Sequence, residues 1–505
     1  MSSGIDQKFV IGDIESTIES SLQTITYVPK GKENGPCEVP LILENDAKKP
    51  DTLFLYFTVL TGTLLFFVSG ATLVWTSPVI PMLRSNNTEI NPMGYPISTT
   101  EVSLIAGVPS LTMLFGSVIL ARVSELVGRK RCLQIIGLGL FSSTLLIAFS
   151  PNVLLIVLFR SVLYIFYIGT LTVLPVYITE ICEDHNRAKF GCLMGAFLPF
   201  GNLYTYILGS FCNVRYLTVM IAAPLLFFLA FFNLAPETPV YLLSKGRKDQ
   251  CIKAIHAVRK NKTSREINEE FVKIEGTIQS SVSAQSNFIA LFKTREARWG
   301  MLLAISPVII QNLSGVTVIM TFLAPLFNSA GTSLSGNTMA IIVGSIKVCS
   351  FIFTSTIIEK TGRRRMLLIS TLGTGIPLFV LGIFFYLKQQ NSHLLPYIQW
   401  LPLACVISNV VMYSLGLGSI PMAIMGEYFP IELRSLALSF IMIIFGLIMF
   451  VTTFTYPYID DYLGVHWCVW MYSGVCFLGF IFMYLVIPET KGKTLNEIQE
   501  YLKTR

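Results

Sequence analysis

Twelve apolar runs, each about twenty residues long, limit most strongly how this chain can fold. A helix needs roughly 20 apolar residues to cross the hydrocarbon core of a bilayer. Within lipid, only a helix satisfies its own backbone hydrogen bonds inside one segment. The sequence therefore predicts an all-α integral membrane protein with twelve transmembrane helices. The predicted spans are 53–76, 102–121, 132–150, 153–178, 190–212, 216–235, 300–327, 338–358, 366–387, 400–426, 436–459 and 467–487.

The composition excludes two broad classes of protein. Of the 505 residues, 53% are hydrophobic and 13% are charged. Soluble domains carry roughly 25% charged residues, so a soluble enzyme is excluded. The net charge of +7 does not indicate a nucleic-acid binder, because the basic residues follow membrane topology and form no single basic face.

The basic residues also predict the orientation. With the N-terminus inside, all but five of the 37 Lys and Arg residues fall on the cytosolic side. The exceptions are Arg84, Arg215 and Lys388 in outer loops, and Arg160 and Lys347 within spans. The positive-inside rule therefore predicts that both termini are cytosolic. Asn86 then begins a sequon in an outer loop, which predicts N-glycosylation there.

The polar segments divide the chain into five parts. We expect a cytosolic tail without a cleavable signal peptide, a first six-helix half, a cytosolic linker with short amphipathic helices over 246–275, a second six-helix half and a short cytosolic tail. In that order, the predicted boundaries are 1–50, 51–235, 236–298, 299–487 and 488–505.

The two halves carry the same charged motifs in the same order. SELVGRKR at 124–131 follows the second span and IEKTGRRR at 358–365 follows the eighth, while PETPV at 236–240 and PETKG at 488–492 follow the sixth and twelfth. The matched charges are Glu125 and Arg129 with Glu359 and Arg363, and Glu180 and Arg187 with Glu427 and Arg434. Three matched pairs on one face predict a duplicated, pseudo-symmetric six-helix unit.

These repeated charges suit a conformational latch at the cytosolic helix ends. Arginine side chains can bridge to carboxylates or to helix C-termini across the seam between the halves. Such pairs would form when the inner gate is shut and separate when it opens. The alternative is that the loop charges only set the topology.

Several motifs together resemble the sugar porter branch of the major facilitator superfamily, and within it the insect facilitated trehalose transporters and glucose facilitators. They are WTSP (75–78), GRKR (128–131), PVYITE (175–180), PETP (236–239), QNLSG (311–315), GLGSIPM (416–422) and PETKGKTL (488–495). The resemblance implies two halves that rock about a central site near the bilayer midplane.

The resemblance also implies the substrate-binding positions, several of which depart from the family pattern. The implied substrate-binding residues are Thr72, Gln311, Asn312, Thr317, Lys347 and Met422. Positions where the family has other residues include Gly195 for a glutamine, Lys347 for an asparagine, Met422 for a tryptophan and Phe445 for an asparagine.

Lys347 is the sharpest departure, because it lies ten residues into the eighth span. A basic residue at that depth costs at least about 2.5 kcal/mol. In one interpretation Lys347 faces a wet cavity and favours an anionic or electron-rich solute. In the other it hydrogen-bonds to backbone carbonyls, with its charge lost through desolvation.

We predict facilitated uniport of a sugar, trehalose or glucose, in the plasma membrane. Thr72 stands where proton-coupled relatives place a carboxylate, so coupled transport has no evident relay. The alternatives are a carrier of the same fold for an anionic solute, or a nutrient sensor that barely transports. The short C-terminal tail disfavours a sensor, and EVPLIL (38–43) suggests endosomal sorting. We expect no enzymatic activity, metal, cofactor or nucleic-acid partner, and a monomer as the default state.

Overall fold

The protein is described by a computed structural model that covers residues 51–183, 185–282, 295–332, 334–421 and 431–489. The side chains of 277–282, 296–297, 355–361 and 431–436 are not described either. The predicted N-terminal tail, with its sorting motif, and most of the predicted C-terminal tail lie outside these ranges. So do Met422 and Glu427, and the side chains of Glu359 and Arg434.

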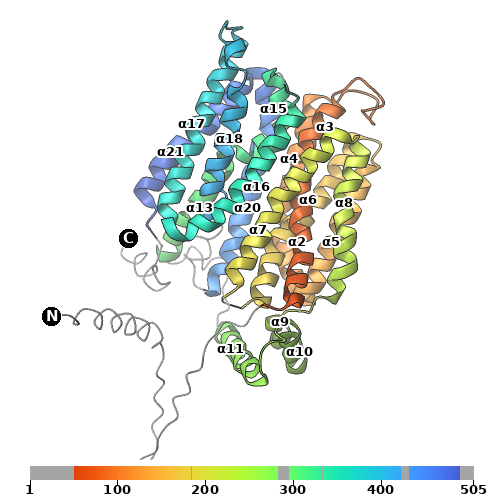
Figure 1. Ribbon diagram of the computed structural model, residues 1–505, viewed down its shortest axis with the longest axis vertical. Coiled ribbons are helices and arrows are strands. Elements are labelled where there is room, and N and C mark those ends of the chain that lie inside the picture. The colour runs from red at the N-terminus through yellow and green to blue at the C-terminus, as the bar shows by residue number, and fades with distance from the viewer. Residues whose placement is uncertain (1–50, 184, 283–294, 333, 422–430, 490–505) are drawn as a thin grey trace, which may run out of the picture. The chain divides into compact units, whose positions relative to one another are not determined.

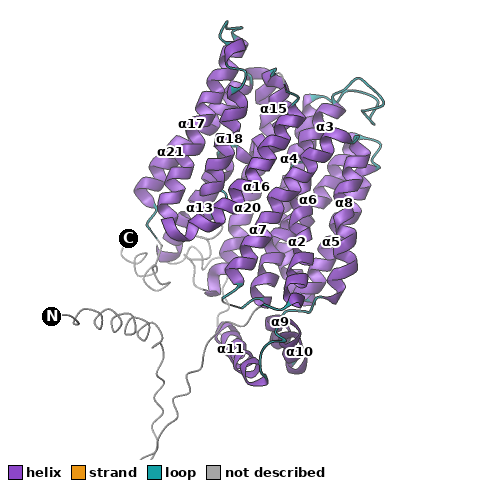
Figure 2. Cartoon of the chain, viewed as in Figure 1, coloured by secondary structure: helices purple, strands orange, loops and turns teal. Residues whose placement is uncertain are grey.

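The described chain folds into helices joined by loops (Figures 1 and 2). The N-terminal half contains α2 (Leu53–Leu73), α3 (Thr76–Leu83), α4 (Thr99–Val127), α5 (Arg129–Ala148), α6 (Val153–Ile181), α7 (Arg187–Phe211), α8 (Val214–Phe231) and the 3₁₀ turn η1 (Phe232–Leu234). Three further helices follow: α9 (Pro239–Ser244), α10 (Lys248–Val258) and α11 (Ser264–Val282). The C-terminal half contains α13 (Arg295–Leu313), α14 (Val316–Thr321), α15 (Leu323–Ala330), α16 (Gly336–Thr361), α17 (Arg363–Gln389), the 3₁₀ turn η2 (Leu395–Tyr397), α18 (Leu401–Leu415), α20 (Ile431–Leu463) and α21 (Val465–Val486).

Eleven of the twelve predicted spans have helices that are long and apolar enough to cross a membrane within the described residues. The tenth predicted span is represented by the shorter apolar helix α18. The prediction of an all-α integral membrane protein is confirmed.

Two span boundaries differ from the prediction. The first span continues past residue 76 as α3, so that apolar helix extends to Leu83. Pro78 lies in the first turn of α3, where a proline is tolerated, so it does not end the span. The seventh span, predicted as one run, is divided into α13, α14 and α15, with Gly315 at φ +74° before α14.

Helix packing repeats between the halves, as a duplicated unit requires. In the N-terminal half, α4 and α5 both pack on α6, α5 also packs on α8, and α2 packs on α7. In the C-terminal half, the equivalent α16 and α17 both pack on α18, α17 also packs on α21, and α13 packs on α20. Two equivalent contacts join the halves, α4 with α20 and α7 with α16. The pseudo-twofold relation follows from this matched pairing.

The glutamates of the two PET motifs make the same contact in both halves. Gly128 and Gly362 have φ of +106° and +96° and are the N-cap residues of α5 and α17. The Glu237 carboxylate accepts from the backbone N–H of Lys130 at 2.9 Å, and Glu489 accepts from that of Arg363 at 3.1 Å. A carboxylate therefore caps the free N–H groups at the start of both helices.

Candidate solute site between the two halves

A polar contact crosses between the halves inside the membrane-spanning bundle. The side chain of Asn202 is fully buried in α7, and its neighbours orient its amide so that the nitrogen donates to the carbonyl oxygens of Gly70 (2.8 Å) and Leu198 (3.2 Å). Its amide oxygen then accepts a hydrogen bond from Nζ of Lys347 in α16 at 2.8 Å. The Lys347 amine thus reaches the opposite half, and its partner is a side-chain amide rather than the backbone carbonyl of one predicted interpretation.

A second polar group lies where α13 meets α18. Gln311 is buried and donates to the hydroxyl of Tyr413 at 3.2 Å and to the carbonyl of Gly418 at 3.4 Å. Within the described chain, its carbonyl oxygen Oε1 has no hydrogen-bond partner, and neither has the hydroxyl of Ser419. An unpaired buried acceptor costs about 1–3 kcal/mol, so this site gains from a ligand that donates a hydroxyl.

Two of the other implied substrate-binding residues, Thr72 and Asn312, already donate hydrogen bonds within their own helices. Thr72 is buried and its hydroxyl donates to Ser69 O in its own helix at 3.0 Å. The Asn312 amide likewise donates to Val308 O at 2.9 Å. Thr317 is half-buried in α14, and Met422 lies outside the described residues.

Sequence reasoning missed two members of this region, Asn202 and Tyr413. Asn202 lies two helical turns after Gly195, the position where the resembled family has a glutamine, and therefore on the same face of α7. That spacing could have identified it. Tyr413 is brought to Gln311 only by the packing of the C-terminal half.

Hydrogen bonds between the halves gather at the end of the bundle that contains α3. Thr76 donates to Thr321 O at 3.0 Å, and Ser77 Oγ accepts from the N–H of Ala324 at 3.0 Å. The buried Tyr206 hydroxyl donates to Met320 O at 2.9 Å. Asn337 donates to Gly209 O at 3.0 Å. These bonds close the seam on that side of Asn202 and Lys347.

Arg160 is almost completely buried in this same end of the N-terminal half. Its Nε donates to Ile105 O at 3.2 Å and its Nη2 to the Tyr164 hydroxyl at 3.3 Å. The guanidinium carbon lies 4.7 Å from the ring centre of Trp75. Arg160 therefore donates to polar groups of its own half, and the Trp75 and Tyr164 rings lie against its guanidinium.

At the opposite end, the predicted latch charges form pairs within one half. Arg129 Nη2 lies 3.2 Å from Glu180 Oε1, which joins α5 to α6, and Glu125 pairs with Arg122 on the exposed side of α4. These two pairs do not cross the seam. Arg187 begins α7 and Arg363 begins α17, as their repeat positions require.

A larger charge cluster holds α10 and α11 against the N-terminal half. Glu183 accepts from Arg259 Nε at 2.9 Å and from Lys262 Nζ at 2.8 Å. Arg259 Nη1 lies 2.6 Å from Glu270 in α11. Burial raises the pKa of Glu270, and the charges of Arg259 and Lys262 only partly offset this.

The start of α2 joins the same cluster through Asp51. Its carboxylate accepts from Asn186 at 2.7 Å and from Lys189 at 2.8 Å, and His185 lies 3.8 Å away. Burial raises the pKa of Asp51, but the hydrogen bonds from Lys189 and Asn186 and the nearby positive charges outweigh burial and lower the pKa overall.

A duplicated helical bundle with polar groups buried between its halves defines the class of membrane transporters with the major facilitator fold. Solved structures agree: the inward-open xylose transporter XylE from E. coli aligns with a TM-score of 0.72 at 21% identity, over 88% of this chain and 99% of that one. Its partially occluded inward-open form aligns equally well, at 20% identity over 88% and 100%. At these identities the likeness shows the fold alone.

The sugar (and other) transporter family matches residues 54–502, and the chain belongs to this family. A facilitated trehalose transporter, Tret1 of Culex quinquefasciatus, is 30% identical over 87% of this chain and 84% of its own length. Tret1 of Drosophila pseudoobscura pseudoobscura is 29% identical over 88% of this chain. The chain spans about half the length of that Drosophila relative, 51%.

Proposed function

We propose that the chain is a sugar uniporter that works by alternating access, with trehalose and glucose as its first candidate substrates. The observation that carries the proposal is the buried carbonyl oxygen of Gln311, which has no hydrogen-bond partner within the described residues; the same holds for the buried Ser419 hydroxyl. Sugar hydroxyls donate and accept hydrogen bonds, and a site with such unpaired groups discriminates against solutes without hydroxyls. The trehalose-transporting relatives support the same substrate class.

The bonds at the α3 end favour an inward-facing state. We place the α3 end outside the cell and the end that holds α9–α11 in the cytosol, because the basic residues concentrate there. Thr76, Ser77, Tyr206 and Asn337 would then separate from their partners when the site opens outward. Arg187 at the start of α7 and Arg363 at the start of α17 would help hold the cytosolic ends together when the site shuts there.

The location and modification follow from this orientation. We propose a plasma-membrane carrier without enzymatic activity, with cytosolic termini and with glycosylation at the exposed Asn86 in the loop after α3. Treating purified protein with a glycosidase would shift its mobility if Asn86 carries a glycan. An Asn86→Gln variant would show no such shift.

Uptake of labelled trehalose and glucose into proteoliposomes tests the substrate. We expect saturable entry that stops at equilibrium and is insensitive to proton uncouplers, because Thr72 cannot carry a proton as a carboxylate does. Gln311→Ala should reduce sugar uptake by about tenfold or more, since it removes the polar groups offered to a hydroxyl. Leu302→Ala, an exposed position in the same helix, is the matched control.

Three other outcomes would contradict the proposal. Accumulation above equilibrium that uncouplers abolish would indicate coupled transport. Uptake of small organic anions, but not of sugars, that is lost in Lys347→Asn would indicate an anionic solute. Binding of sugar without uptake would indicate a sensor.

A further inference from the structure

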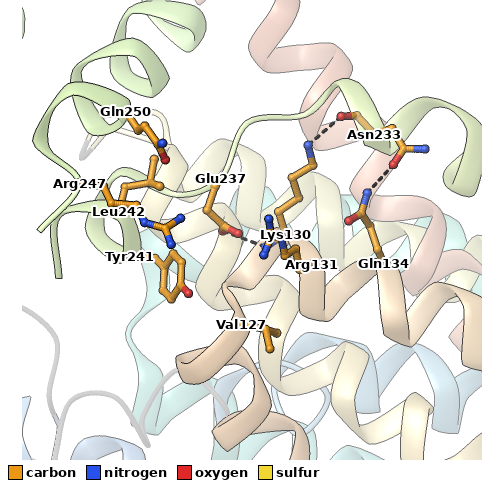
Figure 3. Close-up of a pocket in the computed structure, with 10 residues that line it drawn as sticks. All are labelled: Val127, Lys130, Arg131, Gln134, Asn233, Glu237, Tyr241, Leu242, Arg247 and Gln250. Carbon is orange, nitrogen blue, oxygen red and sulfur yellow. Dashed lines mark hydrogen bonds between the residues drawn. The ribbon is translucent and has the colours of Figure 1, made fainter. Parts of the chain in front are cut away.

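A pocket of about 330 Å³ lies at the end of the N-terminal half that we place in the cytosol. Its lining residues, labelled in Figure 3, include none of the solute-site residues. It is formed by the first turns of α5, the loop after η1, and α9 and α10. The side chains that give it its charge and polarity are Lys130, Arg131, Gln134, Glu237, Arg247 and Gln250. Three are cationic and one is anionic, so the pocket is positively charged.

The single carboxylate of the pocket is already engaged. Glu237 Oε1 accepts from the backbone N–H groups of Lys130 (2.9 Å) and Thr238 (3.0 Å). Through its bond to Lys130, this carboxylate caps the start of α5. Nζ of Lys130 donates to Asn233 O at 2.7 Å. Within the described part of the chain, the guanidinium groups of Arg131 and Arg247 form no hydrogen bond or ion pair. The pocket therefore presents two guanidinium groups with free donors.

The pocket lies where the lipid-facing surface of the bundle ends. On α5, Arg131 is followed on the same face by Ile135 and Leu138, which are 45% and 58% exposed. The neighbouring helix α8 exposes Phe227 and Phe231. Both helices are apolar enough to span a membrane, so we expect these exposed side chains to face acyl chains. A basic pocket thus continues directly from an apolar surface.

We propose that this pocket binds the phosphorylated headgroup of an acidic phospholipid of the cytosolic leaflet. Arg131 and Arg247 would each offer a planar pair of N–H donors, which suits phosphate oxygens. The acyl chains would lie along Ile135 and Leu138. Acidic lipids are concentrated in the cytosolic leaflet, where basic groups attract them. The adjoining apolar surface favours a lipid over a soluble phosphate.

Binding to the purified full-length chain in detergent tests this proposal without any transport assay. The probes are dioctanoyl phosphatidylinositol 4-phosphate, the same headgroup without acyl chains, and dioctanoyl phosphatidylcholine, each followed by native mass spectrometry. We expect the acidic lipid to bind the parent most tightly. The double variant R131Q/R247Q should bind it about thirtyfold more weakly, as two basic contacts are lost. The control R122Q/R265Q removes two exposed arginines that pair within α4 and α11.

A gain of affinity provides a second test, in case the double variant folds poorly. Gln250→Arg adds a cation to the same pocket and should tighten binding of the acidic lipid by about fivefold. Unchanged binding in R131Q/R247Q, or an equal loss in the control, would overturn the site. Equal affinity for the headgroup without acyl chains would overturn a lipid as its occupant, and equal affinity for phosphatidylcholine would overturn recognition of charge.

Discussion

The side-chain nitrogen of Lys347 in α16 lies 2.8 Å from the amide oxygen of Asn202 in α7, and this hydrogen bond joins the two halves within the membrane. Asn202 is held in place by its own bonds to Gly70 O and Leu198 O. A basic residue in the middle of a span is thereby matched with a fixed acceptor, which lowers the cost of placing it there.

Removing one partner of this bond should destabilise the protein more than removing both. Asn202→Ala leaves the Lys347 nitrogen without its acceptor, so we expect a loss of about 2 kcal/mol in the free energy of unfolding. Lys347→Met combined with Asn202→Leu should recover much of that loss. A double-mutant cycle followed by thermal unfolding measures the coupling between the residues. Strictly additive effects would show that the bond contributes nothing.

The close crossing of α2 and α7 depends on two glycines. A methyl group on Gly201 would lie 1.8 Å from Phe67 O, and one on Gly70 would lie 2.1 Å from Leu198 O. Because both obstacles are backbone atoms, Gly201→Ala should cost about 3 kcal/mol or more and reduce the yield of folded protein.

Gly191→Ala is the matched control in the same helix, since nothing lies within 4 Å of its added methyl. Alanine is the better helix former, so this variant should be neutral or slightly stabilising. Size-exclusion profiles and melting temperatures in detergent compare the two. Equal behaviour of Gly191→Ala and Gly201→Ala would refute the crossing as the cause.

The break between α13 and α14 requires glycine at position 315. Its φ is +74°, and an added methyl would lie 2.1 Å from the Tyr472 ring. Gly315→Ala therefore combines backbone strain of about 1 kcal/mol with a steric clash. We expect strongly reduced uptake and a lower melting temperature.

Gly94 separates the two contributions, because it has a similar φ of +77° but open space around it. Gly94→Ala should show only the smaller backbone effect. If both variants lose the same stability, the contact with Tyr472 has no role.

The buried Arg160 should not tolerate lysine. Lysine keeps the charge but loses the planar contact with Trp75 and the paired donation to Ile105 O and Tyr164. We expect Arg160→Lys to lower stability by about 2 kcal/mol. The same exchange at Arg122, whose side chain is 77% exposed, should change the melting temperature little. A tolerated Arg160→Lys would mean that only the charge matters.

Asp51 should make stability depend on pH in the acidic range. Its pKa in the folded protein lies below the ordinary value, so ionised Asp51 stabilises the folded state above that ordinary value. The stabilisation is lost as pH falls through the folded pKa, when Lys189 and His185 lose their negative partner.

We therefore expect Asp51→Asn to melt at a lower temperature than the parent at neutral pH, and the difference to shrink below about pH 4. Asp249→Asn in the exposed first turn of α10 is the control. A difference that grows on acidification would contradict the assignment. Melting curves over an acid-to-neutral series give the result.

The sequence by itself determined the twelve-span architecture and its duplication. Apolar runs must become helices in lipid, because water is absent there to satisfy the backbone. The matched positions of Gly128 and Gly362 required no knowledge of packing, since each half repeats the same local motif. The helix boundaries at α3 and Gly315 were harder to predict from the sequence, because a proline or glycine either continues or interrupts a helix according to its neighbours.

The tertiary structure alone decided which polar groups meet. Lys347 was visible in the sequence, but Asn202 becomes its partner only where α16 packs on α7. Arg129 pairs with Glu180 inside one half, and not across the seam, because α5 packs on α6. Helical periodicity fixes which face of a helix a residue occupies. The partner of that face depends on contacts between helices far apart in the chain, and these arise only when the two halves pack together.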